Sequence, residues 1–180
     1  MLSLPMVFAS SRLHWLVYGL LACLLMMPQA AQAAAPAVAL YYGRTIPLEE
    51  FRTFDIVVVE PDHGHDPVRY QASGSTLYAY VSVAEAHPSR AYYANIPPSW
   101  KMARNGQWNS DVLDQTPEAW PDFFATRVVG PLWERGYKGF FLDTLDSYRL
   151  AEKFDETAQQ EGLVRVIETL HRRFPGIRLI

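Results

Sequence analysis

Short apolar runs recur along the chain from residue 37 onwards, separated by stretches that contain proline, glycine or polar residues. Runs of this length that are rich in β-branched and aromatic residues are typical of strands buried on both faces. The pattern therefore predicts strands at residues 37–42, 54–60, 76–85, 137–143 and 177–180.

Helical spacing of apolar residues appears between these runs. Pro47 to Phe51 is expected to form a short helical turn with proline in its first turn. A longer helix is predicted from Thr116 as N-cap and Pro117 at the first helical position to Gly136, and another over residues 157–173. The first half of the connection before the longer helix, residues 90–115, is predicted to be an ordered functional loop, because it holds several aromatic residues.

The alternation of buried strands and helices indicates an α/β fold with a parallel sheet. Five strands fit either an open doubly wound sheet or the first five strands of a (β/α)8 TIM barrel, which usually needs about 250 residues. Because the sequence stops inside a strand, we favour a barrel of which about the first five strands are present. On this view, residues 36–180 are the N-terminal part of the barrel domain.

Residues 1–33 read as a signal peptide. Arg12 precedes an apolar run over residues 15–27, and Ala31-Gln32-Ala33 provides a cleavage site near Ala33. The run is shorter than the roughly 20 residues that a membrane-spanning helix needs. We expect a periplasmic or secreted protein without stable membrane insertion after cleavage. An uncleaved anchor and lipidation at Cys23 are the alternatives.

Charge and cysteine content narrow the function classes. Nineteen acidic residues against sixteen basic ones give a formal net charge of −3, which disfavours nucleic acid as a partner. Cys23 is the only cysteine and lies in the predicted signal peptide, so the mature chain would form no internal disulfide.

Candidate chemistry lies where the predicted strands end. Glu60, Glu85 and Asp143 each close an apolar run, so in a parallel sheet all three are expected at one rim, where α/β enzymes carry their sites. Asp146 follows three residues after Asp143. Paired carboxyl groups are the requirement of glycoside hydrolysis, in which one protonates the leaving oxygen and the other attacks carbon or activates water. The simpler interpretation is that Asp143 or Asp146 caps the next helix.

Aromatic side chains would complete a sugar site, because apolar sugar faces stack on them, although aromatic residues also dominate cores. The candidates are Tyr41, Tyr80, Trp100, Trp108 and Tyr148.

The segment Asp62-His63-Gly64-His65-Asp66 raises a metal alternative, in which His63 and His65 serve an unrelated α/β metalloenzyme. The spacing matches no finger, ribbon or H-E-x-x-H pattern, so we expect no metal, with His63 able to reach a substrate at the rim. Serine-hydrolase, P-loop and dinucleotide-binding motifs are absent from the sequence, and no cofactor is expected.

The chain resembles glycoside hydrolase family 114 over roughly residues 38–180. Within the family it is most similar to N-terminal hydrolase domains that are followed by a polysaccharide deacetylase domain. The motifs that carry the resemblance are Tyr41-Tyr42-Gly43, Val58-Val59-Glu60-Pro61-Asp62-His63, Ala79-Tyr80-Val81-Ser82-Val83-Ala84-Glu85 and Gly139-Phe140-Phe141-Leu142-Asp143-Thr144-Leu145-Asp146-Ser147-Tyr148.

The resemblance implies a (β/α)8 barrel that acts as a retaining endo-hydrolase on α-1,4-linked galactosamine or N-acetylgalactosamine polymers, such as a Pel-like exopolysaccharide of a biofilm matrix. It implies that Asp143, at the end of the fourth strand, is the catalytic nucleophile. The implied partners are a galactosamine-rich polysaccharide and other exopolysaccharide export proteins. The expected substrate-binding residues are Glu60, Glu85, Asp146, Tyr41, Tyr80, His63 and Tyr148.

In the family the acid/base glutamate lies in a later strand, which would fall after Ile180. We therefore expect the chain to be C-terminally truncated, and these 180 residues alone to be inactive and poorly stable. The alternative to truncation is that Glu60 or Glu85 serves as the acid/base. The alternative function is a non-catalytic polysaccharide-binding domain that retains the rim of the barrel.

Overall fold

The computed structural model describes residues 35–45, 48–71 and 74–180. The chain divides into two units, residues 1–35 and 36–180, and all the described helices and strands lie in the second. The predicted signal peptide and Pro47 fall outside the described residues.

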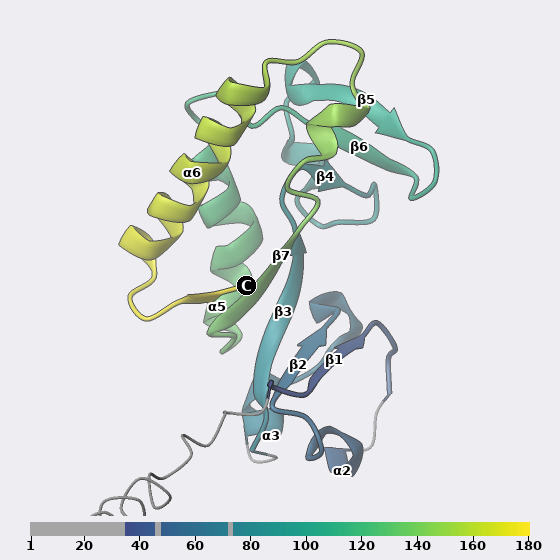
Figure 1. Ribbon diagram of the computed structural model, residues 1–180, viewed down its shortest axis with the longest axis vertical. Helices are drawn as coiled ribbons and strands as arrows, with labels where there is room; N and C mark the ends of the chain where they lie inside the picture. Colours follow the sequence, from purple (N-terminus) through teal and green to yellow (C-terminus); the bar gives the residue numbers. More distant parts are fainter. Residues whose placement is uncertain (1–34, 46–47, 72–73) are drawn as a thin grey trace, which may run out of the picture. The chain divides into compact units, whose positions relative to one another are not determined.

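The main sheet of the described chain has five strands in the order β1-β2-β3-β7-β8, and every neighbouring pair is parallel. In Figure 1 these strands follow one another across the sheet in the order of the chain. A doubly wound sheet would reverse its strand order at a switch point, so the order here is that of a barrel. The strands are β1 Val38–Tyr41, β2 Ile56–Val59, β3 Thr76–Ser82, β7 Gly139–Asp143 and β8 Arg178–Leu179.

The register aligns the carboxyl ends of the central strands. Val59 pairs with Ala79, and Ser82 pairs with Asp143. Glu60, directly after β2, and Asp143, the last residue of β7, therefore lie at the same edge of the sheet. This part of the sequence-based prediction is confirmed.

The predicted strand 76–85 is wrong at its end, because β3 stops at Ser82 and Glu85 begins another strand, β4 Glu85–Ala86. The chain bends at Val83 and Ala84, which stay fully buried. Since the apolar run continues through the bend, hydrophobicity alone does not reveal where the strand stops.

The segment predicted as an irregular loop contains a β-hairpin. Strands β5 Lys101–Asn105 and β6 Ser110–Leu113 pair in antiparallel fashion, and β6 also pairs with β4 to give a second sheet of order β4-β6-β5. The sequence of β5 is polar, so it carries no apolar run to predict it. Two short 3₁₀ turns precede the hairpin, η2 Tyr93–Asn95 and η3 Pro98–Trp100.

The helix expected from Thr116 begins later. It runs continuously through α4 Trp120–Phe123, a π-helical stretch η4 Phe124–Val129 and α5 Gly130–Glu134, with Ala119 at the N-cap. The backbone N–H of Thr116 instead donates to the carboxylate of Asp114 in a turn. The end near Gly136, which has a φ of 105°, agrees with the prediction.

The helix predicted at residues 157–173 is confirmed as α6 Glu156–Arg173, and the Asp155 carboxylate accepts a hydrogen bond from the backbone N–H of Ala158 as its N-cap. Helix α6 lies beside the α4–α5 helix in Figure 1. At Gly162 it approaches the chain so closely that an added Cβ would lie 2.1 Å from the carbonyl oxygen of Gln115. The remaining short helices are α2 Leu48–Phe51, η1 Pro61–His63, α3 Pro67–Gln71 and η5 Ser147–Leu150.

The apolar core joins the sheet to the helices. Residues of β2, β3 and β7 contribute to the same buried cluster as the α4–α5 helix and α6; its members include Val57, Ala79, Val81, Phe140, Phe124, Val128, Leu132, Val166 and Leu170. The core fixes the strands whose carboxyl ends carry the polar residues described next. Within the described residues, none of the helices combines the length and apolar character needed to cross a membrane.

Candidate active site

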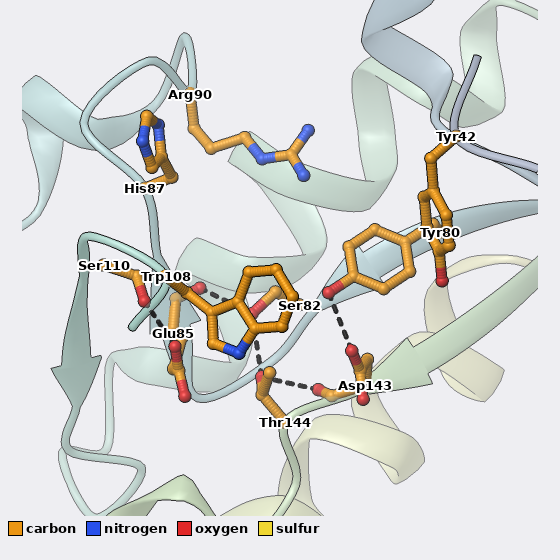
Figure 2. Close-up of a pocket in the computed structure, with 10 residues that line it drawn as sticks. All are labelled: Tyr42, Tyr80, Ser82, Glu85, His87, Arg90, Trp108, Ser110, Asp143 and Thr144. Carbon is orange, nitrogen blue, oxygen red and sulfur yellow. Dashed lines mark hydrogen bonds between the residues drawn. The ribbon is translucent and has the colours of Figure 1, made fainter. Parts of the chain in front are cut away.

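A cavity of about 540 Å³ lies at the carboxyl ends of β3 and β7, which Figure 2 shows from close by. Part of it is formed by the last residues of β3 and β7 and by the residues that follow β1 and β7, and the rest by β4, the segment after β4 and the hairpin β5–β6. We call this cavity the candidate pocket. Its lining consists of Tyr42, Tyr80, Ser82, Glu85, His87, Arg90, Trp108, Ser110, Asp143 and Thr144.

Asp143 is held in the pocket by Tyr80. The Tyr80 hydroxyl donates a hydrogen bond of 2.7 Å to Oδ2 of Asp143, as the dashed line in Figure 2 shows. Burial, followed by this hydrogen bond, raises the pKa of Tyr80 well above its ordinary value, so the phenol stays protonated and donates to the carboxylate. The ring of Tyr42 packs edge-on against that of Tyr80 with 5.4 Å between the centroids.

Thr144 adopts a conformation that threonine rarely takes. Its φ of 62° lies in the left-handed region, which is unfavourable for a β-branched side chain. Its hydroxyl oxygen accepts from the backbone N–H of Ala84 at 3.2 Å and lies 2.8 Å from Oγ of Ser82. These bonds tie the residue after Asp143 to the bend after β3, and so compensate the strain while fixing where β7 ends.

Glu85 joins three segments of the pocket wall. The side chain is buried, and its oxygens accept hydrogen bonds from Asn105, from Ser110 and from Ser147, the last at 2.6 Å. The donors come from β5, β6 and η5, so the carboxylate fastens the hairpin to the segment after β7.

The hairpin places an aromatic ring at the pocket. Trp108 lies in the connection between β5 and β6 and is 68% exposed, and its indole lies over the pocket in Figure 2. In strand β6 of the same hairpin, Asp111 binds Lys101 at 3.0 Å and Arg104 at 2.7 Å and accepts from the Tyr93 hydroxyl. Burial alone would raise the pKa of Asp111, but the hydrogen bonds from these three residues outweigh burial and lower the pKa to about 2.

Glu60 lies at the expected edge of the sheet but is engaged by Arg90. The guanidinium binds both carboxylate oxygens of Glu60, at 2.6 and 2.9 Å, and also Asp62 at 2.8 Å. Glu60 is nearly buried and does not line the candidate pocket, whereas Arg90 does. The prediction that Glu60 contacts substrate therefore stays a prediction, since Arg90 binds both of its carboxylate oxygens and Glu60 is not part of the pocket lining.

Two aromatic residues expected to bind sugar lie elsewhere. The Tyr41 hydroxyl donates to the carbonyl of Thr45, and its ring packs against Phe51. Successive residues of a strand face opposite sides, so Tyr42 and not Tyr41 reaches the pocket. Tyr148 is 2% exposed and packs against Phe154, as a core residue does.

Trp100, another aromatic candidate, packs edge-on against Trp120 and Phe123. Tyr80 and Trp108 are thus the predicted aromatic residues that the structure brings to the pocket.

The two histidines of the segment Asp62-His63-Gly64-His65-Asp66 contact other residues of the protein in the loop after β2. His65 is buried, with Nδ1 at 2.7 Å from the Tyr70 hydroxyl and Nε2 at 2.9 Å from the carbonyl of Gly43. The same carbonyl lies 3.3 Å from Nδ1 of His63. Within the segments that the structure describes, no three His, Cys, Asp or Glu side chains converge as metal ligands.

Asp146 is exposed and stands at the N-cap position of η5, where its side chain forms no capping hydrogen bond. Neither it nor His63 lines the pocket. The substrate-binding roles of Asp146 and His63 therefore stay predictions. The positions of these two residues do not support them.

Six residues that line the pocket were missed by sequence reasoning: Tyr42, Ser82, His87, Arg90, Ser110 and Thr144. Tyr42 could have been found from the alternation of side chains after β1. Arg90, Ser110 and Thr144 depend on contacts between distant segments, and nothing in their local sequence distinguishes them.

Comparisons with known proteins agree with this architecture. The sequence profile of glycoside-hydrolase family GH114 matches residues 26–179. Comparison with curated proteins gave no match. The glycoside hydrolase domain of PelA from Pseudomonas aeruginosa is 35% identical, with a TM-score of 0.68 over 81% of this chain and 59% of that domain.

More distant structures share the fold. Ega3 from Aspergillus fumigatus, solved in complex with galactosamine, is 13% identical, with a TM-score of 0.65 over 79% of this chain and 57% of the other. The α-galactosidase TtGalA from Thermus thermophilus, in complex with stachyose, is 16% identical, with a TM-score of 0.56 over 85% of this chain and 41% of the other.

The chain thus spans 59% of the PelA domain that it matches. The five parallel strands are part of a TIM barrel, as the sequence predicted. From the family profile and the identity to the PelA domain together, the chain belongs to glycoside-hydrolase family GH114.

Proposed function

We propose that this protein hydrolyses an exopolysaccharide of α-1,4-linked galactosamine and N-acetylgalactosamine, as a retaining endo-hydrolase with Asp143 as the nucleophile. The observation that carries the proposal is the position of Asp143, which closes the fourth parallel strand and faces the candidate pocket beside Tyr80. Membership of family GH114 and the identity to the PelA domain support hydrolysis of a glycosidic bond. The galactosamine complex of Ega3 suggests the class of sugar.

In this mechanism, a carboxylate oxygen of Asp143 attacks C1 of the sugar while an acid protonates the leaving oxygen. Water then hydrolyses the glycosyl ester and releases Asp143, with the same acid acting as the base that accepts a proton from the water. Tyr80 orients the nucleophile. Its hydroxyl donates to the Asp143 carboxylate before attack and again after the glycosyl ester has been hydrolysed. Because this donor is already in place before the reaction, it does not have to reorient when the negative charge on Asp143 changes.

The acid/base is not evident among the described residues of the pocket. Asp143 and Glu85 are the two carboxylates in its described lining, and Glu85 accepts hydrogen bonds from three side chains. These bonds hold the pocket wall together, and they occupy both carboxylate oxygens of Glu85. We propose that a glutamate from a later barrel strand supplies the proton, at about 5 Å from Asp143 as retention requires.

The charge of the pocket suits a partly deacetylated polymer. Such a chain carries ammonium groups, which Asp143 and Glu85 would attract. The indole of Trp108 offers a face on which a sugar ring or an ammonium group can stack.

The location is part of the proposal as well: the signal-peptide pattern of residues 1–33 supports a periplasmic or secreted enzyme that acts on a Pel-like biofilm matrix beside export proteins.

The decisive test compares the full-length protein with its Asp143→Asn variant on a galactosamine-rich polymer. We expect Asp143→Asn to lose hydrolysis by at least about a thousandfold while its circular dichroism and melting temperature stay close to those of the parent. Asp122→Asn is the matched control, because Asp122 is exposed on α4 and outside the pocket lining. Full activity of Asp143→Asn would exclude it as the nucleophile.

Analysis of the products tests separately whether the enzyme is endo-acting and whether it retains the anomeric configuration. An endo-hydrolase releases oligosaccharides of mixed length at early times, and a retaining enzyme gives the α-anomer first, which proton NMR can follow. If the full-length protein binds the polymer but releases no oligosaccharide, the alternative of a non-catalytic polysaccharide-binding domain replaces the proposal.

A further inference from the structure

Thr144 is a strained residue directly after the proposed nucleophile. Among the described residues, the non-glycine residues with a positive φ are Asn109, at 52°, and Thr144, at 62°. Asparagine adopts this region routinely, whereas a β-branched residue there is an outlier. Strained residues persist only where other contacts hold them, and they cluster at active sites. We therefore examined what the turn at Thr144 does for Asp143 and which contacts hold it.

The turn keeps the chain out of the candidate pocket. Every second residue of a strand faces the same side, so a strand β7 that continued past Asp143 would place Leu145 on the same face, at the rim of the pocket. The left-handed conformation of Thr144 ends the strand instead. Leu145 is exposed and does not line the pocket, whereas Asp143 does. The strained turn thus leaves the carboxylate of Asp143 open to the pocket.

The side-chain hydroxyl of Thr144 holds the turn. The hydroxyl of Ser82 donates to the carbonyl of Glu85 at 2.8 Å, so its oxygen accepts from the hydroxyl of Thr144, also 2.8 Å away. The Thr144 oxygen in turn accepts from the backbone N–H of Ala84 at 3.2 Å. Ala84 is fully buried, so without the Thr144 oxygen this N–H would have no acceptor among the described residues. Loss of the hydroxyl therefore leaves a buried donor unpaired.

The backbone of Asp143 is tied to the same bend. Its carbonyl accepts from the backbone N–H of Val83 at 2.9 Å. Together with the bonds of the Thr144 hydroxyl, this bond fixes the end of β7 against the end of β3, the strand that carries Tyr80. The 2.7 Å hydrogen bond from Tyr80 to the carboxylate of Asp143 depends on that alignment.

We propose that Thr144 is a positioning residue for the nucleophile. Its strained turn holds the carboxylate of Asp143 at the hydroxyl of Tyr80, and its own hydroxyl holds the turn. The inference rests on the proposed function and adds a residue to it. It makes two separable statements: kcat depends on the hydroxyl of Thr144, whereas the backbone conformation lowers stability. A residue that served only the fold would change kcat and stability together.

Three replacements in the full-length protein separate the hydroxyl from the strain. Thr144→Ser keeps the hydroxyl and removes the β-branch. Thr144→Val keeps the β-branch and removes the hydroxyl. Thr144→Gly removes the hydroxyl and also relieves the backbone, because glycine adopts a positive φ without strain. Thr157→Val is the matched control for the loss of a threonine hydroxyl, since Thr157 is exposed on α6 and outside the pocket lining.

The measured quantities are kcat and KM on α-1,4-linked galactosamine oligosaccharides. Thr144→Val and Thr144→Gly should lower kcat by about tenfold to a hundredfold and change KM by less than about threefold, because a misplaced nucleophile weakens the transition state and not substrate binding. Thr144→Ser should keep kcat within about threefold of the parent, and Thr157→Val within about twofold. Parent-like kcat in Thr144→Val, or a loss in Thr144→Ser as large as in Thr144→Val, overturns the proposal.

Thermal unfolding tests the strain. Although Thr144→Gly and Thr144→Val should lose similar activity, Thr144→Gly should melt at least about 2 °C above Thr144→Val, because only valine keeps a β-branched side chain at a φ of 62°. If Thr144→Gly melts no higher than Thr144→Val, the turn is not strained and the proposal is wrong.

Crystal structures keep the inference separate from catalysis. If the parent hydrolyses none of these oligosaccharides, the proposed function fails, and the position of Asp143 is then compared among the parent, Thr144→Val and Thr144→Ser. The hydrogen bond between Tyr80 and Asp143 should be broken in the valine variant and kept in the serine variant. An intact bond in Thr144→Val overturns the proposal even if its kcat falls, because the hydroxyl would then act in another way, such as by contacting the substrate.

Discussion

Tyr80 and Asp143 lie on neighbouring parallel strands and are joined by a hydrogen bond of 2.7 Å from the phenol to the carboxylate. The contact spans 63 positions of sequence and exists because Ser82 pairs with Asp143 in the sheet. Burial and the carboxylate keep the pKa of Tyr80 well above neutrality, so the donor persists over the whole range of working pH.

Replacing Tyr80 by phenylalanine should therefore slow hydrolysis without unfolding the protein. A hydrogen bond to a charged group contributes about 1.5–3 kcal/mol, which corresponds to a loss in kcat of about tenfold to a hundredfold. Tyr78→Phe is the control, since Tyr78 lies on the same strand but does not line the pocket. If kcat of Tyr80→Phe equals that of Tyr78→Phe, the phenol does not position the nucleophile.

The ion pairs of Asp111 should make the stability of the protein depend on acid pH. The folded-state pKa of about 2 lies below the ordinary value of 3.8, so the carboxylate stabilises the fold above pH 4, and this contribution disappears as the pH falls from about 4 to 2. Asp111→Asn should lower the free energy of unfolding by about 2 kcal/mol at pH 7 and by little at pH 2.

Urea unfolding at both pH values measures the effect of Asp111. Asp122→Asn is the control, because Asp122 is exposed and its pair with Arg173 is long, at 3.6 Å. A deficit in Asp111→Asn that is equally large at pH 2 would show that the side chain acts through packing and not through its charge.

Gly162→Ala should destabilise the protein, against the usual trend for helices. Alanine in a helix interior is normally about 1 kcal/mol better than glycine, but here the added Cβ would meet the carbonyl oxygen of Gln115 at 2.1 Å. We expect a net loss of about 1–3 kcal/mol in urea unfolding. Gly106→Ala, where nothing lies within 4 Å, should leave stability nearly unchanged or slightly higher. Stabilisation by Gly162→Ala would contradict the observed approach of α6.

Trp108→Ala should weaken polysaccharide binding by about threefold to thirtyfold and leave the melting temperature almost unaffected, since the indole is 68% exposed. Trp108→Phe should retain most of the affinity, because an aromatic face remains. Isothermal titration with galactosamine oligosaccharides in the Asp143→Asn background separates binding from turnover. Equal affinity of the alanine and phenylalanine variants would show that an aromatic face at position 108 does not contribute to binding.

Much of the main sheet could be predicted from the sequence, because a parallel strand buried on both faces is a continuous apolar run bounded by glycine, proline or polar residues. Asp143 could be placed for the same reason: it is the first acidic residue after such a run, and the carboxyl ends of parallel strands share an edge. Helix α6 could be predicted equally well, since it has a regular apolar stripe and an aspartate at its N-cap.

The rest depends on contacts that a linear pattern does not encode. Glu85 follows an apolar run as Asp143 does, yet the buried bend at Val83 and Ala84 places it in another sheet. Arg90 reaches Glu60 across 30 positions, and Ser147 reaches Glu85 across 62. The polar strand β5 is held by the hydrogen bond from Asn105 to Glu85 and by pairing with β6, and so it shows no hydrophobic period.

The bonds of Glu85 make the hairpin a part of the site that could be exchanged. The strand that carries Asp143 belongs to the barrel, whereas Trp108 and the donors Asn105 and Ser110 belong to an insertion between β3 and the α4–α5 helix. Because one carboxylate links the two, a hairpin of another length or sequence could be attached at the same place if it supplied donors to Glu85. Exchanging hairpins between homologues that keep this glutamate is therefore a route to enzymes with the same bond-cleaving residue and altered substrate range.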